Sequence, residues 1–277
     1  MSAGRFLGLL RRAVARAFHD NCFGIAKGVA FSAILSFFPG LMVVAGILFS
    51  QDVGGIVREL SDAMARVLPP DAHRLATQFL FGVDGASQGL LIGAAVVAVW
   101  SASGAVLSLT QGLQAAYQAP ESRGMLWGRV VALLLVLLAG MPLLGATLLL
   151  LFGSQIEAWL LAHLDSARGP VALAGRALRW GLALGASVTV TAVLYQFGPK
   201  RRQRWRYVWP GALLTTALWL AATLAFGWYV QHLARYRDFY GSISAVAVLL
   251  IWMYILSLIV LVGCEFNAEY EKSSRRK

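Results

Sequence analysis

The sequence predicts an all-α, polytopic integral membrane protein with six transmembrane helices and both termini in the cytoplasm. Of its 277 residues, 58% are hydrophobic and only 13% are charged, whereas a soluble domain carries about 25% charged residues. Six apolar stretches are each long enough to cross a hydrocarbon core of about 30 Å, which takes about 20 helical residues. Because backbone groups find no water inside lipid, each stretch is expected to be a helix.

The expected membrane domain covers residues 26–268. Its six spans are residues 26–50, 89–117, 127–153, 177–198, 207–231 and 243–268. The outer loop, residues 51–88, has apolar residues at helical spacing, and Pro69-Pro70 divides it. We therefore expect two amphipathic helices on the outer face of the bundle, which form either a structural cap or a lid over an outward-facing cavity.

Two short segments flank this domain. Residues 1–25 are expected to contain a cytoplasmic amphipathic helix, and residues 269–277 a basic cytoplasmic tail. The apolar residues of the first segment recur every four positions, at Phe6, Leu10, Val14 and Phe18. Such a helix is expected to lie on the anionic leaflet, with its apolar face down and its arginines among the lipid headgroups.

The net charge of +11 is distributed unevenly along the chain. When the N-terminus is placed in the cytoplasm and the six spans alternate, 16 of the 24 Lys and Arg residues fall on the cytoplasmic side and 8 on the other. Cytoplasmic segments of membrane proteins carry such an excess of basic residues, so both termini are predicted to be cytoplasmic. The two cysteines, Cys22 and Cys264, then lie near the reducing side and are expected to be free thiols.

Small and polar residues follow one face of several expected spans. In lipid, such faces point into the bundle or into a wet cavity. Two interpretations remain open, which are tight packing with hydrogen bonds between helices and the lining of a substrate path. For the second, the candidate residues are Ser32, Ser36, Ser101, Ser103, Ser108, Gln111, Glu265 and Asn267.

Glu265 is the most notable of these residues, because it is an ionisable group in the last turns of the sixth span. A charged group at membrane depth is costly, and it commonly marks a functional site. Glu265 also lies near the cytoplasmic end, where it can reach water or pair with Lys27 or Arg129. A proton-binding function and a structural ion pair are therefore both open.

Five further residues are candidates for gating or for contacts with lipid headgroups. Pro39 removes one hydrogen bond from the first span and is expected to bend it. Lys27 lies at the cytoplasmic mouth of the same span. The run Lys200–Arg206 is either a topogenic loop or a binding site for anionic headgroups. The candidates from this run are Arg201, Arg202 and Arg204.

No catalytic motif is found in the sequence. The four histidines are isolated, and no two of them have the spacing of metal ligands: His19, His73, His163 and His232. A Walker A sequence does not occur. The pattern G-x-S-x-G occurs at Gly85–Gly89, but it lies in the outer loop before the second expected span and not between a strand and a helix, as a nucleophile elbow requires. We therefore expect no metal, no cofactor, no nucleic-acid partner and no enzymatic activity.

The chain resembles the YihY/BrkB family of bacterial inner-membrane proteins, and the similarity extends in order along nearly its whole length. The matching segments are Ala30-Phe31-Ser32, Phe38-Pro39, Trp100–Gly104, Pro210-Gly211-Ala212, Tyr240-Gly241-Ser242, Trp252-Met253-Tyr254 and Gly263–Ala268. One departure is Phe31, where members of the family often have a tyrosine. The resemblance implies a six-helix protein of the bacterial inner membrane. Some members are labelled ribonuclease BN, and this sequence gives that label no support.

The leading functional hypothesis is a transporter or flippase-like protein for a lipid or another amphipathic or anionic substrate. Its partners are then membrane lipids, with anionic headgroups at the cytoplasmic face, and a homo-oligomer is compatible with the sequence. One alternative is a secondary cation/proton antiporter in which Glu265 binds the proton. Another is a non-transporting scaffold of the envelope. A cavity within the bundle would favour transport, and a solid bundle would favour the scaffold.

Overall fold

The computed structural model describes residues 3–50, 61, 65, 73, 74, 76–78, 87–119, 124, 126–140, 142, 168–201, 203–232 and 243–275. Over these residues all regular structure is helical, which confirms the all-α part of the predicted fold class. Most of the expected outer loop, residues 51–88, and the second half of the expected third span lie outside the described residues. Arg202 and the segment Tyr240-Gly241-Ser242 lie outside them as well.

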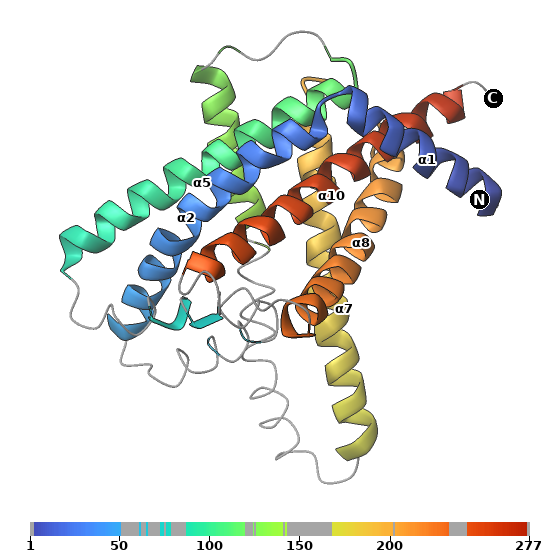
Figure 1. Ribbon diagram of the computed structural model, residues 1–277. Coiled ribbons are helices and arrows are strands. Elements are labelled where there is room, and N and C mark those ends of the chain that lie inside the picture. Colours follow the sequence, from blue (N-terminus) through green and yellow to red (C-terminus); the bar gives the residue numbers. More distant parts are fainter. Residues whose placement is uncertain are drawn as a thin grey trace.

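Long helices make up the described chain (Figure 1). They are α1 (Ala3–His19), α2 (Cys22–Ser50), α5 (Gln88–Ala116), α7 (Arg168–Phe197), α8 (Trp205–His232) and α10 (Ile243–Arg275). A shorter apolar helix, Leu126–Gly140, follows α5. The helices α2, α5, α7, α8 and α10 each contain an apolar segment of 18 to 30 residues, enough to cross a membrane. These five coincide with the first, second, fourth, fifth and sixth expected spans. The described part of the third expected span is the helix Leu126–Gly140.

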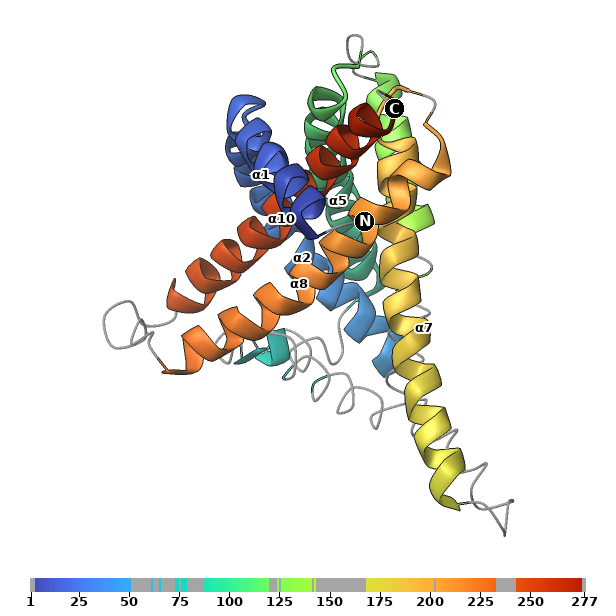
Figure 2. The same cartoon turned by 90° about the vertical axis from the view of Figure 1, so that its right-hand side faces the viewer.

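The helices form a bundle in which α2 and α5 run side by side in opposite directions, while α10 crosses between α2 and α8 (Figure 1). The helix α7 packs against α8, and its N-terminal half extends beyond the other labelled helices (Figure 2). The helix α1 lies along the C-terminal part of α10. We call this end of the bundle the α1 end. Both ends of the described chain lie there.

The contact between α2 and α5 is formed by small residues that allow a close approach. A Cβ added to Gly28 would lie 3.7 Å from the Ser108 hydroxyl, and one added to Gly104 would lie 3.4 Å from the Ser32 hydroxyl. The polar faces predicted for the first two spans therefore meet each other here. The helix α2 also continues through Pro39 as one helix.

The contact between α8 and α10 is closer still, because Gly211 and Gly263 face each other across it. A Cβ on Gly211 would collide with the Gly263 carbonyl, and one on Gly263 would collide with the hydroxyl of Thr215. The sequence Pro210-Gly211 interrupts the internal hydrogen bonding of α8, because proline has no N–H. This places the backbone of α8 within reach of α10.

The helix α1 packs on α10 through one face only. Leu9 and Ala13 are fully buried there with Phe266, and Phe6 and Leu10 pack beside them. Of the four residues expected to face the lipid, Phe6 and Leu10 thus contact protein, whereas Val14 and Phe18 are exposed. The described chain remains helical to Arg275, so most of the expected basic tail is part of α10.

The outer surface of the bundle is apolar over much of its area. Large apolar side chains are exposed along α5, α7 and α8, including Ile92, Val96, Leu178, Leu182, Leu213 and Leu224. A water-soluble monomer rarely exposes so continuous an apolar surface. In a membrane these side chains would contact apolar lipid chains, which agrees with the membrane character predicted from composition.

Candidate functional site

A cavity of about 350 Å³ lies among the helices, near the middle of the apolar segments. Side chains from α2, α5, Leu126–Gly140, α7, α8 and α10 line it. The lining includes Val190, Leu194, Thr215, Trp219, Met253 and Ser257. We refer to it as the intramembrane cavity.

Hydroxyl groups of Thr191, Thr215 and Ser257 at this cavity already bond to protein. Ser257 donates to the Met253 carbonyl at 2.7 Å, and Thr191 donates to the Ser187 carbonyl at 2.9 Å. The indole Nε1 of Trp219, by contrast, is buried and has no hydrogen-bond partner in the described structure. The cavity therefore has mainly apolar walls, and the Trp219 N–H among its lining residues is a buried donor without a partner.

The wall on the side of α8 is fixed by Tyr195, which is completely buried. Its phenol donates to the Val260 carbonyl at 2.6 Å and lies 2.7 Å from the Thr215 hydroxyl. Because a phenol has a single hydrogen, Thr215 is the donor in the second bond. The hydroxyl thus ties α7, α8 and α10 together beside the cavity.

Asn267 joins α10 to the interrupted part of α8. Its amide oxygen accepts from the Gly211 N–H at 2.7 Å, and its amide nitrogen donates to the Val208 carbonyl at 2.9 Å. The side chain is fully buried. Asn267 thus supplies hydrogen-bond partners to backbone groups next to Pro210. Its observed contacts hold α8 and α10 together.

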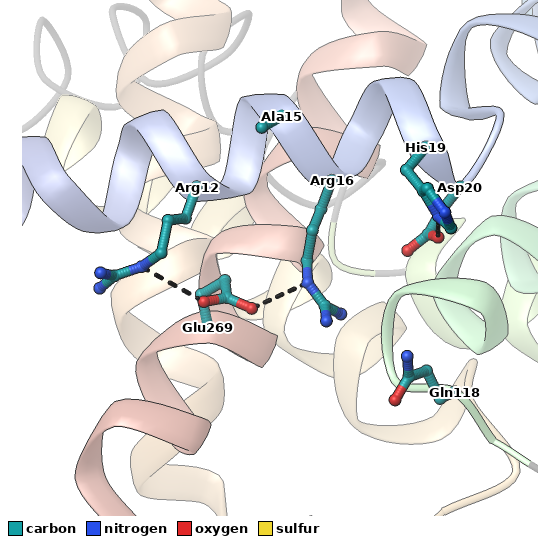
Figure 3. A pocket seen from close by; sticks show the side chains of 7 residues that line it. All are labelled: Arg12, Ala15, Arg16, His19, Asp20, Gln118 and Glu269. Carbon is teal, nitrogen blue, oxygen red and sulfur yellow. Dashed lines mark hydrogen bonds and ion pairs between the residues drawn. The ribbon is translucent and has the colours of Figure 1, made fainter.

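At the α1 end, α1 is held to α10 by ion pairs that surround a surface pocket of about 380 Å³. Glu269 binds Arg16 Nε at 2.9 Å and Arg12 Nε at 3.4 Å. Figure 3 shows both arginines reaching down from α1 to this carboxylate, with His19 and Asp20 at the far end of the helix and Gln118 opposite. Two arginines expected among lipid headgroups thus contact protein.

A second ionic cluster lies close by. Glu271 binds Arg201 Nη2 at 3.2 Å and Arg275 Nη2 at 2.7 Å. Arg201 also lies over the ring of Tyr117, with its Cζ 5.6 Å from the ring centre. Burial raises the pKa of the Tyr117 hydroxyl, which therefore stays neutral.

Glu265 is fully buried in α10 behind these clusters. Its Oε1 lies 3.9 Å from Cys22 Sγ, and its carboxyl group is within hydrogen-bonding reach of Asp20. Neither pairing considered from the sequence is formed: Lys27 is exposed, and Arg129 places its Cζ 4.0 Å above the ring of Trp100. Cys22 and Cys264 are both buried and free, as expected.

The other predicted site residues are distributed over several places. Ser36 and Ser103 donate to carbonyls one turn earlier in their own helices, at 2.8 and 2.7 Å. Ser101 is half-buried, Gln111 is exposed, and Arg204 is exposed. Among the described candidates, none lines the intramembrane cavity. The remaining candidates lie in three separate helix contacts. Ser32 and Ser108 lie between α2 and α5, Glu265 lies near Cys22 of α2, and Asn267 lies between α8 and α10.

The residues that line the cavity carry no distinctive pattern in the sequence. Thr215 was on a small-polar face of the fifth expected span, but Val190, Leu194 and Met253 are ordinary apolar residues of their spans. Asp20 carried a signal, since it is the only acidic residue among the first 50. No group of three or more potential metal ligands occurs in the part of the chain that the structure describes.

These features define a polytopic α-helical membrane protein with a partly open cavity among its helices. The chain belongs to the BrkB virulence factor family, whose model matches residues 13–277. The family match confirms the resemblance to the YihY/BrkB family that was noted from the sequence segments.

Three similar proteins each match about nine-tenths of this chain. One is the "Putative ribonuclease-like protein YfkH" of Bacillus subtilis (strain 168), which is 29% identical over 89% of this chain and 89% of its own. Another is a "UPF0761 membrane protein" of Tolumonas auensis, 28% identical over 91% of this chain and 82% of its own. A "UPF0761 membrane protein" of Laribacter hongkongensis is 32% identical over 91% of this chain, which spans only 58% of that relative. No solved structure matches the chain.

Proposed function

We propose that this chain is a bacterial inner-membrane protein that moves a lipid or another amphipathic molecule between leaflets. The observation that carries the proposal is the intramembrane cavity. Its volume of about 350 Å³ lies in the range of small-molecule sites, about 300 to 1,000 Å³. A scaffold that acts only through its surface has no need for such a cavity.

The chemistry of the cavity favours an acyl chain as the bound group. Its walls are mainly aliphatic and aromatic, and the hydroxyl groups of Thr191, Thr215 and Ser257 are occupied by bonds within the protein. The indole N–H of Trp219 is buried in this lining without a partner, and we propose that it turns toward a bound lipid and donates to its ester carbonyl. A buried polar group without a partner is costly, so a ligand that supplies an acceptor gains that energy on binding.

The headgroup side of the proposal comes from the α1 end, which we place in the cytoplasm. Exposed basic residues gather there: Arg11, Lys27, Lys200 and Arg204. The charge distribution favours this orientation, because cytoplasmic segments are enriched in Lys and Arg. These residues are then available to anionic headgroups, whereas the arginines that bind Glu269 and Glu271 serve the fold.

A lipid-translocation assay in proteoliposomes tests the proposal. The lipid carries a fluorophore that an impermeant reductant bleaches only in the outer leaflet. We expect faster loss of the protected half in vesicles with protein than in protein-free vesicles. Leu194→Trp, which fills the cavity, is expected to slow this process. Leu182→Trp is the matched control, because it makes the same change on the exposed side of α7.

Two results would remove the proposal. One is translocation no faster than in empty vesicles, for both neutral and anionic phospholipids. The other is an equal rate for both tryptophan variants, each shown to be monodisperse and helical. Trp219→Phe gives a third comparison, because it keeps an aromatic side chain and removes the indole N–H donor.

A second candidate function, cation/proton exchange, is favoured by one observation: the carboxylate of Glu265 is fully buried and one of its oxygens has no donor. Ionisable groups at such positions in membrane proteins often belong to proton pathways. An acidified proteoliposome with a pH-sensitive dye tests it. A pH gradient that does not respond to sodium or potassium would count against exchange.

A further inference from the structure

Two carboxyl groups meet where the turn between α1 and α2 contacts α10. Asp20 lies in that turn, between His19 and the left-handed residue Asn21, whose φ is 53°. Glu265 lies opposite on α10, and the two side chains are within hydrogen-bonding reach of each other. The Glu265 residue is fully buried, whereas the Asp20 side chain is 16% exposed.

The partners of the four oxygens leave one pair unsatisfied. Glu265 Oε1 is 3.9 Å from Cys22 Sγ, and Asp20 Oδ1 is 3.0 Å from His19 Nδ1. The remaining oxygens, Glu265 Oε2 and Asp20 Oδ2, are both buried and have no donor in the described structure. Two ionised carboxylates only accept hydrogen bonds and repel each other. A single proton turns this contact into a hydrogen bond and removes one of the two charges.

The neighbouring cations do not donate to Oδ2 of Asp20 or Oε2 of Glu265 in the described structure, where Nη1 of Arg16 is also buried and unpaired. Arg16 from α1 and Lys272 from α10 face the pair. Both are engaged by Glu269, with Arg16 Nε at 2.9 Å and Lys272 Nζ at 3.9 Å from its carboxylate. The remaining titratable groups around the pair are the buried Cys22 on α2, Cys264 on α10 and Tyr117 at the end of α5, and His19, whose side chain is 89% exposed.

The proton has a route from water. Asp20 and His19 line the surface pocket at the α1 end, together with Arg12, Arg16, Gln118 and Glu269 (Figure 3). Glu265 does not line it. Asp20 therefore separates Glu265 from the solvent of the pocket, and the exposed His19 lies beside it.

We propose that Asp20 and Glu265 form a proton-binding site in which one proton is shared between Oδ2 of the first and Oε2 of the second. The site exchanges its proton with the aqueous phase through the pocket at the α1 end. Proton binding joins the α1–α2 turn to α10, and proton loss places two like charges in contact there. The site does not depend on whether the chain translocates lipid.

Infrared difference spectroscopy of the full chain in detergent or in vesicles tests this proposal. The spectra are recorded across a pH titration, in which a protonated carboxylic acid gives its own carbonyl band. We expect one such band that bleaches on raising the pH. Glu265→Gln and Asp20→Asn are each expected to remove it. Glu271→Gln is the control, because Glu271 is a buried carboxylate of the same helix with two arginine partners.

Several outcomes would overturn the proposal. They are the absence of any protonated-carboxyl band in the wild-type chain, a band that persists in both single variants, and a band lost in the Glu271 variant alone. A band that sodium chloride removes at constant pH, while choline chloride does not, would assign the pair to a metal cation instead. If the variants do not fold, wild-type protein with a ¹³C label in its glutamate carboxyl groups gives the same answer. One glutamate is then expected to titrate apart from the others in the NMR spectrum, and its absence would contradict the shared proton.

Discussion

Replacing Asn267 by alanine is expected to destabilise the bundle through the contact between α8 and α10. The substitution removes the bonds to the Gly211 N–H at 2.7 Å and to the Val208 carbonyl at 2.9 Å. Hydrogen bonds between transmembrane helices contribute about 0.6 kcal/mol on average and up to about 1.7, so two bonds give a loss of about 1 to 3 kcal/mol. The upper part of that range is expected, because the backbone groups left behind are buried next to Pro210 and lack a replacement partner.

The assay is equilibrium unfolding in mixed micelles with an increasing fraction of a denaturing detergent, followed by circular dichroism. Ser257→Ala on the same helix is the matched control, because its hydroxyl bonds only to the Met253 carbonyl of α10, at 2.7 Å. Removing such a bond within one helix is expected to change the free energy of unfolding by less than about 0.5 kcal/mol. Equal midpoints for the two variants would refute the bracing function of Asn267.

Three further predictions use other parts of the structure. Gly263→Ala is expected to destabilise the bundle by about 1 to 3 kcal/mol in the same assay, because the added Cβ meets two buried hydroxyl groups. Gly181→Ala, where the position of the Cβ is open, is expected to be neutral or stabilising by up to about 1 kcal/mol; the opposite order would contradict the packing described. Glu269→Gln is expected to speed amide hydrogen exchange in α1 at low salt, since it weakens the ion pairs with two arginines. Because such exposed pairs are screened, the difference is expected to shrink at high salt, and a salt-independent effect would count against an ionic cause. Cys22 and Cys264 are expected to react with a maleimide only after denaturation, since both are fully buried; rapid labelling in mild detergent would contradict their placement.

The helices could be predicted from the sequence because their signal is local. A stretch such as residues 89–117 is apolar over its own length, and its observed helix, α5, differs from it by one residue at each end. The small-polar faces were also local patterns, and those of α2 and α5 do meet at Gly28, Ser32, Gly104 and Ser108.

The candidate site could not be predicted in the same way, because it depends on which helices cross. Asn267 is one polar residue in an apolar span, and only the position of Pro210-Gly211 opposite shows what it binds. The intramembrane cavity is formed where six helices leave space between common apolar residues, which no spacing within one helix records. Asp20 was visible as a lone acidic residue, but its contact with Glu265, 245 positions later in the chain, appears only in three dimensions.

The central claim is that the intramembrane cavity binds the acyl chain of a lipid. The most direct measurement reconstitutes the protein with a phospholipid that carries a photoactivatable group within its acyl chain, then maps the labelled residues by mass spectrometry. The account predicts labels on cavity residues such as Val190, Leu194 and Met253, and their loss in the Leu194→Trp variant. Labels confined to the outer surface, at residues such as Ile92 and Leu178, would contradict it.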